Sequence, residues 1–181
     1  MELIIPEKKY KDSFIKALKN GFSSGGRPVK TEPEIREIEN DFDGFLKKTT
    51  STEVDPTPVL RDDGKYYVNV PQIIYWLIDN GEFIGEFDLR VGLNEFLKRY
   101  TGGNVAYGIS PEYRRKGYAT KGLSLLIGKA KGKGMSELLV SAAESNIGSR
   151  KVIENNGGVL TEIIEPPWKN EKFRKYRIKI K

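Results

Sequence analysis

The dipeptide Asn80-Gly81 constrains the fold of this chain more than any other local feature, because it separates two β-rich runs. The run before it, 70–79 (VPQIIYWLID), is rich in β-branched and aromatic residues, and 82–90 (EFIGEFDLR) follows directly. An Asn-Gly pair between such runs is the strongest short-range signal for a β-hairpin, since both residues tolerate positive φ. The sequence therefore predicts an antiparallel hairpin in the middle of the chain.

Strand and helix patterns flank this hairpin on both sides. Before it we expect a strand at 1–6, a helix at 7–20, a helix that begins after Thr31 and continues through Leu46, and a loop at 49–65. After it we expect a helical turn within 93–103, strands at 104–110, 137–143, 158–164 and 173–181, and helices within 111–134 and 145–158. The last strand alternates cations with apolar residues, which is typical of a sheet edge.

The order β-α-α-β-β-β-α-β-α-β-β predicts an α/β fold with a mixed, mostly antiparallel sheet flanked by helices. A chain of 181 residues fits a single domain over 1–181. No apolar run approaches the roughly 20 residues of a membrane span, and the N-terminus lacks the apolar stretch of a signal peptide. We therefore expect a cytoplasmic protein.

The chain contains neither Cys nor His. Disulfides, thiol nucleophiles, zinc-thiolate sites and Ser-His-Asp relays are thereby excluded, and no Asp/Asn-rich calcium loop is present, so we expect no metal site. Catalysis has to come from Asp, Glu, Tyr, Lys, Ser or the backbone.

Positive charge is concentrated in the C-terminal part of the chain. Residues 101–181 carry 16 basic and 7 acidic groups, a net charge of +9, whereas residues 1–100 carry a net charge of −3. This imbalance favours a polyanionic partner. A nucleic acid, a phosphorylated cofactor and an ordinary solvated surface all agree with it.

The turn between the strand at 104–110 and the next helix is the best candidate for chemistry. Arg114, Arg115 and Lys116 lie at the start of the helix, followed by Gly117 and Ala119. A helix N-terminus leaves about four N–H groups unpaired and carries partial positive charge, and small residues let a ligand approach the backbone. Such a turn suits a pyrophosphate, although an ordinary basic loop also agrees with it. Neither a P-loop nor the Gly-x-Gly-x-x-Gly fingerprint is present here.

The motif Arg114-x-x-Gly117-x-Ala119 resembles the Arg/Gln-x-x-Gly-x-Gly/Ala motif of the GNAT superfamily of acyl-CoA-dependent N-acetyltransferases. Tyr107-Gly108-Ile109 and Pro111 agree with the strand that precedes this motif in the family. The later segment 146–158 (NIGSRKVIENNGG) is similar to the family's second strand–helix signature. The resemblance extends over about 70–164, and the two motifs lie about 30 residues apart.

The resemblance implies a GNAT-type twisted sheet and acetyl-CoA as the acyl donor. It implies that the CoA pyrophosphate binds the turn amides, with the residues Arg114, Arg115, Lys116, Gly117, Tyr118, Ala119 and Thr120. It also implies that the strand backbone around Tyr107 and Ile109 pairs with the pantetheine arm, and that the Ile109 amide polarises the thioester carbonyl. Asn146 matches a residue that hydrogen-bonds the pantetheine region, and Ser149 lies one helical turn later.

The catalytic groups are less well defined. Many family members have a Tyr four residues after the Ser149 position, where it protonates the departing thiolate, but this chain has Ile153, which we interpret as a packed helix residue. Water, Tyr118 or Tyr107 can replace the missing acid, or the activity is lost. Glu86, Asp88 and Glu95 are the candidate bases, and Glu86 is our first choice because it lies on a central strand.

We therefore predict an acetyltransferase that moves an acetyl group from acetyl-CoA to an amine by direct attack in a ternary complex. A catalytically reduced CoA-binding regulatory module and a basic nucleic-acid-binding domain are the alternatives. The acceptor stays open among polyamines, aminoglycosides, amino acids and protein amines. We expect no membrane or nucleic-acid partner, and homodimers are common in the family.

Overall fold

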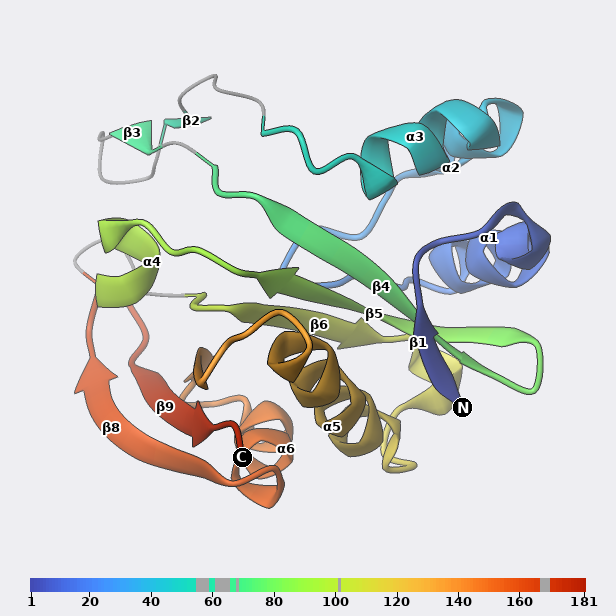
Figure 1. The fold of residues 1–181 in the computed structure, drawn as a ribbon. Coiled ribbons are helices and arrows are strands. Elements are labelled where there is room, and N and C mark those ends of the chain that lie inside the picture. Colours follow the sequence, from blue (N-terminus) through green and yellow to red (C-terminus); the bar gives the residue numbers. More distant parts are fainter. Residues whose placement is uncertain (55–58, 61–65, 68, 101, 167–169) are drawn as a thin grey trace. The chain divides into compact units, whose positions relative to one another are not determined.

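The computed structural model describes the chain except for residues 55–58, 61–65, 68, 101 and 167–169 (Figure 1). It divides the chain into two compact units. The first unit comprises Met1–Ser51, Ile73–Leu89 and Ala106–Leu126, and the second comprises Thr52–Gln72, Arg90–Val105 and Ile127–Lys181. Among the described residues, no helix has both the length and the apolar character needed to cross a membrane.

A four-stranded sheet in the order β1-β4-β5-β6 forms the centre of the first unit. Its strands are β1 (Glu2–Ile4), β4 (Gln72–Asp79), β5 (Glu82–Arg90) and β6 (Val105–Ile109). The predicted hairpin is confirmed: β4 and β5 are joined by Asn80 and Gly81, whose φ angles are 50° and 80°. Because both angles are positive, this turn requires the Asn-Gly pair that the sequence supplies.

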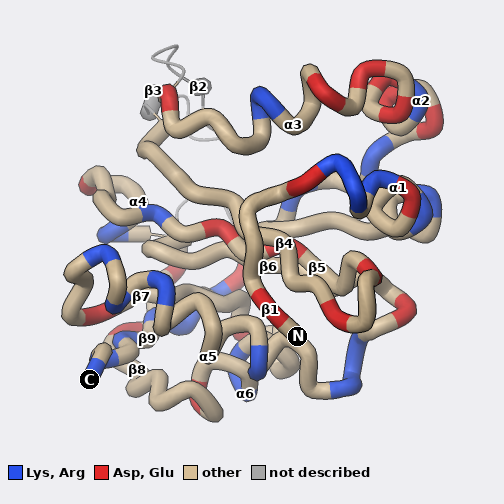
Figure 2. The backbone as a smooth tube through the Cα atoms, turned by 45° about the vertical axis from the view of Figure 1, so that its right-hand side comes forward, with Lys and Arg blue, Asp and Glu red and all other residues tan. Residues whose placement is uncertain are grey.

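Helices cover both faces of this sheet (Figure 1). Those on one face are α1 (Lys11–Lys19), α2 (Glu32–Asn40) and α3 (Phe42–Thr50), while α5 (Tyr118–Lys131) lies on the other. Two short 3-10 turns, η1 (Lys8–Tyr10) and η2 (Pro111–Tyr113), precede α1 and α5. Acidic residues gather along α2, which begins with the predicted capping box of Thr31 and Glu34 (Figure 2).

The single helix expected after Thr31 is wrong in one respect, because it is broken at Asp41. This residue has φ −122° and ψ 65°, which are not helical, and its side chain accepts a hydrogen bond from the Gly44 N–H at 2.9 Å. Asp41 therefore caps a new helix, α3, instead of continuing α2. The apolar residues of the two helices still reach the same core, since Ile35 and Phe42 are both buried.

An aromatic cluster forms the core between the helices and the sheet. The ring of Phe14 on α1 lies 4.5 Å from Trp76, 5.0 Å from Phe83 and 5.3 Å from Phe45, measured between centroids. Trp76 is fully buried. On β5, Phe87 stacks on Tyr107 of β6 at 5.4 Å, and an added Cβ at Gly122 of α5 would lie 2.2 Å from the Phe87 ring. The close approach of α5 therefore requires glycine at position 122.

The second unit contains a three-stranded antiparallel sheet in the order β7-β9-β8. Its elements are β2 (Val59–Leu60), β3 (Tyr66–Tyr67), α4 (Glu95–Arg99), β7 (Glu137–Ala143), α6 (Ile147–Asn155), β8 (Gly158–Ile164) and β9 (Phe173–Lys179). The prediction of β9 as an edge strand is wrong, because β9 pairs on both sides. Most of the loop expected at 49–65 lies outside the described residues, although β2 falls within it.

Removing the Phe14 ring should destabilise the first unit strongly. We expect Phe14→Ala to lower the free energy of unfolding by about 3–5 kcal/mol, because it opens a cavity among the aromatic rings. Ile5→Ala is the control, since Ile5 is 46% exposed and its truncation should change stability by roughly 0.5 kcal/mol or less. Equal losses in the two variants in urea unfolding would contradict this account of the core.

Candidate active site

Strand β6 pairs with β5 along one edge. Along its other edge, its carbonyl groups accept hydrogen bonds from Gly25 and Arg114. The Ser110 N–H donates to the Ile84 carbonyl at 2.9 Å, so the even-numbered residues of β6 direct their backbone groups toward β5. Tyr107 and Ile109 therefore direct theirs away from it. The Tyr107 carbonyl accepts a hydrogen bond from the Gly25 N–H at 3.4 Å, and the Ile109 carbonyl accepts one from Arg114 Nε at 3.0 Å. Both residues that are expected to pair with pantetheine thus direct their backbone groups away from β5.

The basic turn exposes its backbone where the sequence predicted it. Arg114 to Gly117 are exposed, and Arg115 and Gly117 have φ angles of 62° and 83°. The Lys121 N–H donates to the Gly117 carbonyl at 3.2 Å, so the amides of Tyr118 and Ala119 lie before this hydrogen bond, at the N-terminal end of α5 where no preceding helical turn supplies an acceptor. An added Cβ at Gly117 would meet no described heavy atom within 4 Å. The turn therefore presents N–H groups, cations and open space together, which suits an anion.

Tyr118, the first residue of α5, has a partner of its own. Its hydroxyl donates to Asp79 Oδ2 at 3.0 Å. This hydrogen bond, together with desolvation and the charge of Asp79, raises the pKa of Tyr118 above its ordinary value. The phenol therefore keeps its proton at neutral pH, but it has to leave Asp79 before it can protonate another group.

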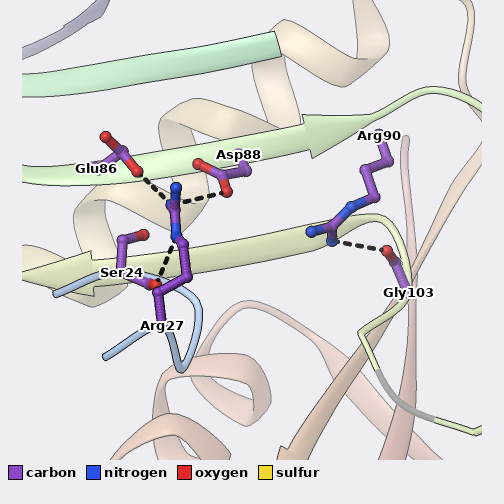
Figure 3. Close-up of polar contacts among 6 residues, drawn as sticks. All are labelled: Ser24, Arg27, Glu86, Asp88, Arg90 and Gly103. Carbon is purple, nitrogen blue, oxygen red and sulfur yellow. Dashed lines mark hydrogen bonds and ion pairs between the residues drawn. The ribbon is translucent and has the colours of Figure 1, made fainter. Parts of the chain in front are cut away.

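The predicted base lies in a cluster of three charges (Figure 3). Arg27 Nη2 contacts Glu86 Oε1 at 2.5 Å and Asp88 Oδ2 at 3.2 Å, which shows that the two carboxylates share one face of β5. Their side chains are only 7% and 3% exposed, whereas the Arg27 side chain is 50% exposed. Burial disfavours the charged guanidinium, but the charges of Glu86 and Asp88 outweigh it and raise the pKa of Arg27.

A cavity of about 230 Å³ adjoins this cluster. Its walls are mainly apolar and come from α1, α3 and β4, with Phe14, Leu18, Phe45 and Ile74 among them. Ser24, Arg27 and Glu86 supply polar groups. The sequence did not indicate Arg27 and Ser24 as site residues, because they lie in a segment without a recognisable motif between the helix expected at 7–20 and the one expected after Thr31.

The remaining predicted residues belong to the second unit. Asn146 caps α6 by accepting a hydrogen bond from the Ser149 N–H at 3.0 Å, and both lie at the start of that helix as expected. Ile153 is fully buried, which confirms its interpretation as a packed residue. Glu95 lies on α4 with a side chain that is 91% exposed, and it pairs with Lys98 at 3.0 Å.

Buried Asn104 fixes the start of β6 within this second unit. Its Nδ2 donates to the Arg90 carbonyl at 2.8 Å, and its Oδ1 accepts from the Leu139 N–H at 2.8 Å. Arg90 Nη1 in turn donates to the Gly103 carbonyl at 3.2 Å (Figure 3). An added Cβ at Gly103 would lie 2.2 Å from the Leu139 carbonyl, so this close approach of β7 requires glycine.

Comparison with models of protein families shows which family the chain belongs to. Residues 35–159 match the family described as acetyltransferase (GNAT) domain, and the chain belongs to this family. It is thus an acetyl-CoA-dependent N-acetyltransferase by class, as its motifs predicted. No curated protein matched the chain.

Solved structures of low sequence identity share the fold. A chimera of the spermidine N-acetyltransferase SpeG from Vibrio cholerae and hSSAT is 12% identical with a TM-score of 0.58, over 99% of this chain and 96% of that one. The ribosomal-protein α-N-acetyltransferase RimL in complex with coenzyme A is 12% identical with a TM-score of 0.61, over 98% and 93%. The acetyltransferase yncA from Salmonella typhimurium, with acetyl-CoA, is 15% identical with a TM-score of 0.54, over 99% and 93%.

The Tyr118 hydrogen bond has a measurable consequence at high pH. Because its pKa is raised in the folded protein, Tyr118 contributes stability that is fully present below about pH 10, the ordinary value for tyrosine, and is lost as the pH rises further. The difference between the absorbance titrations of wild type and Tyr118→Phe should therefore have a midpoint above pH 10. Asp79→Asn should lower that midpoint. A midpoint at or below pH 10 in the wild type would contradict the contact.

Proposed function

We propose that this chain transfers the acetyl group of acetyl-CoA to a primary amine by direct attack, with the turn 114–120 holding the pyrophosphate. The observation that supports this most directly is the N-terminus of α5, where the exposed residues Arg114, Arg115 and Lys116 and the open backbone at Gly117 precede the first turn of the helix. We also propose that both compact units form one acetyltransferase domain over 1–181, since the family match extends through both of them.

Strand β6 is suited to orienting the thioester arm. The outward-facing backbone at Tyr107 and Ile109 offers donors and acceptors in one row, as a pantetheine arm with two amides requires. An incoming amide donor has to replace the Gly25 N–H at the Tyr107 carbonyl. The Ile109 N–H can then donate to the thioester oxygen and stabilise the charge that develops there. Asn146 and Ser149 are proposed as further contacts to the arm.

The chemical step requires one base and one departing thiolate. An ammonium acceptor gives one proton to Glu86, directly or through water, and the freed electron pair on its nitrogen forms the bond to the acyl carbon. The carbon–sulfur bond then breaks, and its electron pair leaves with the sulfur. The nitrogen loses its second proton to form the neutral amide, and this proton reaches the thiolate through water or through the hydroxyl of Tyr118, because Ile153 has none to give. No Cys is available as an acyl carrier, which favours direct transfer.

A second candidate is a CoA-binding module without turnover. The buried Ile153 favours it, because no side chain at that position can protonate the thiolate. A nucleic-acid-binding role has less support, since cations of β9 pair with carboxylates of the same unit: Arg174 with Glu144 at 2.8 Å and Lys175 with Glu162 at 2.8 Å.

The turn is tested with two glycine variants. Acetyl-CoA should raise the Tm of the wild type, because a ligand that binds only the folded state stabilises it by about 2.7 kcal/mol at 100 times its Kd. Gly117→Ala should lose most of this shift, since the Cβ enters the space that the pyrophosphate needs. Gly21→Ala is the matched control: Gly21 has φ 80°, and an added Cβ there would meet no heavy atom within 4 Å in the described part of the chain, so the backbone strain is similar. Equal acetyl-CoA shifts in both variants would remove the turn from the binding site.

The role of Glu86 is tested by the pH dependence of turnover, with an acceptor found in an amine screen that monitors free thiol. Glu86→Gln should lower the rate by about 10²-fold or more near pH 7 and less at alkaline pH, because free amine becomes abundant as the pH rises. Asp88→Asn is the matched control, since it removes a charge from the same cluster. It should lower the rate by a similar factor at every pH. If the rate of Glu86→Gln is also lowered by the same factor at every pH, another group is the base.

A further inference from the structure

The loop between α1 and α2 is fixed to the sheet by contacts of Arg27, one of which reaches Glu86, the proposed base. Arg27 Nε donates to the Ser24 carbonyl at 3.0 Å, which folds the loop into a turn while Nη2 reaches Glu86 and Asp88. The Ser23 carbonyl would lie 2.3 Å from a Cβ at Gly108. The backbone of this loop therefore holds in place the guanidinium of Arg27, which is one of the residues that line the cavity.

Charge at the cavity can be counted from the ion pairs. Glu86 and Asp88 carry two negative charges and Arg27 one positive charge, which leaves one negative charge. Arg27 and Glu86 line the cavity, whereas Asp88 is not part of the lining and acts on it through its ion pair with Arg27. The two other charged residues of the lining, Lys30 and Glu34, pair with each other at 3.6 Å and cancel. A ligand that balances this cluster therefore carries a single positive charge.

The side chains that line the cavity indicate the chemical character of the ligand's remaining atoms. Phe14, Leu18 and Ile74 offer no group that could solvate a second ammonium, and burying an unpaired charge against apolar side chains is costly. Ser24 adds one polar group: the residue is 4% exposed, and its Oγ has no hydrogen-bond partner among the described residues. Because Ser24 and Glu86 line the same cavity, the hydroxyl can accept one N–H of a primary ammonium while the carboxylate accepts another.

We propose that Arg27 determines the acceptor by leaving one net negative charge at an apolar cavity, so that the acceptor is a small primary monoamine with an apolar substituent and not a polyamine. The ammonium lies between Glu86 and Ser24, and its substituent contacts Phe14, Leu18 and Ile74. This inference rests on the proposed transfer to an amine. It names the chemistry of the acceptor, which the family match leaves open.

Calorimetry on the full chain without acetyl-CoA tests this inference separately from the transfer reaction. The probes are phenethylamine, the dication putrescine, and the neutral 2-phenylethanol. The wild type should bind phenethylamine at least about tenfold more tightly than either of the others, which corresponds to about 1.4 kcal/mol. Wild-type preference for putrescine, or no heat with phenethylamine, would overturn the proposal. The acetyl-CoA shift in Tm would then still report on the proposed function.

Two charge variants provide the decisive comparison. Arg27→Met leaves two negative charges, so the binding ratio should move at least tenfold toward putrescine. The double variant Arg27→Met with Asp88→Asn restores one net negative charge and should restore the wild-type ratio. Arg36→Met is the matched control: Arg36 pairs with Glu32 at 3.9 Å on α2 and is not part of the cavity lining, so its ratio should not change.

Arg27→Lys keeps the proposal testable if Arg27→Met fails to fold. Lysine retains the positive charge, so this variant should keep the wild-type preference for phenethylamine over putrescine. An unchanged ratio in a folded Arg27→Met variant, or a shift toward putrescine in Arg27→Lys as large as that in Arg27→Met, would show that the charge of Arg27 does not select the acceptor.

Discussion

The ion pairs of Arg27 with Glu86 and Asp88 are the contact on which the arrangement of the first unit depends. Two carboxylates buried on a central strand are costly unless a cation and hydrogen bonds compensate them. Arg27 is half exposed and reaches them from a loop, so the cost of their burial fixes the position of that loop. Removing one partner of a buried pair typically costs about 3–5 kcal/mol, much of it from the charge left behind. The main effect of these ion pairs is therefore to fix the conformation of the loop that carries Arg27, and their net contribution to stability is secondary.

The loop that carries Arg27 contacts both the proposed acceptor cavity and the strand proposed to bind the acetyl-CoA arm. The same segment that carries Arg27 places the Gly25 N–H on the outward edge of β6 and the Ser23 carbonyl over Gly108. The basic turn follows that strand after the short 3-10 turn η2. The cavity, the outward-facing backbone of Tyr107 and Ile109, and the anion-binding turn thus belong to one compact unit, while Asn146 and Ser149 come from the other.

Features that depend on neighbouring residues could be predicted from the sequence, and features that depend on distant partners could not. The hairpin at Asn80-Gly81, the capping box at Thr31 and the exposed turn at Gly117 follow from local backbone preferences. The break at Asp41 also has a local cause, and Asp41-x-x-Gly44 could have indicated it. The central place of β9 depends on pairing with both β7 and β8, which alternation within one strand does not encode. Arg27 meets Glu86 and Asp88 across 59 and 61 residues, so no pattern along the chain indicated the contact.

The most direct test of the account is product analysis by mass spectrometry. The purified chain is incubated with acetyl-CoA and phenethylamine, and N-acetylphenethylamine and free CoA thiol are quantified together. The account predicts both products in equal amounts, dependent on enzyme and amine. Acetyl-CoA binding without any amine-dependent product, for phenethylamine and for a broad panel of primary amines, would contradict it.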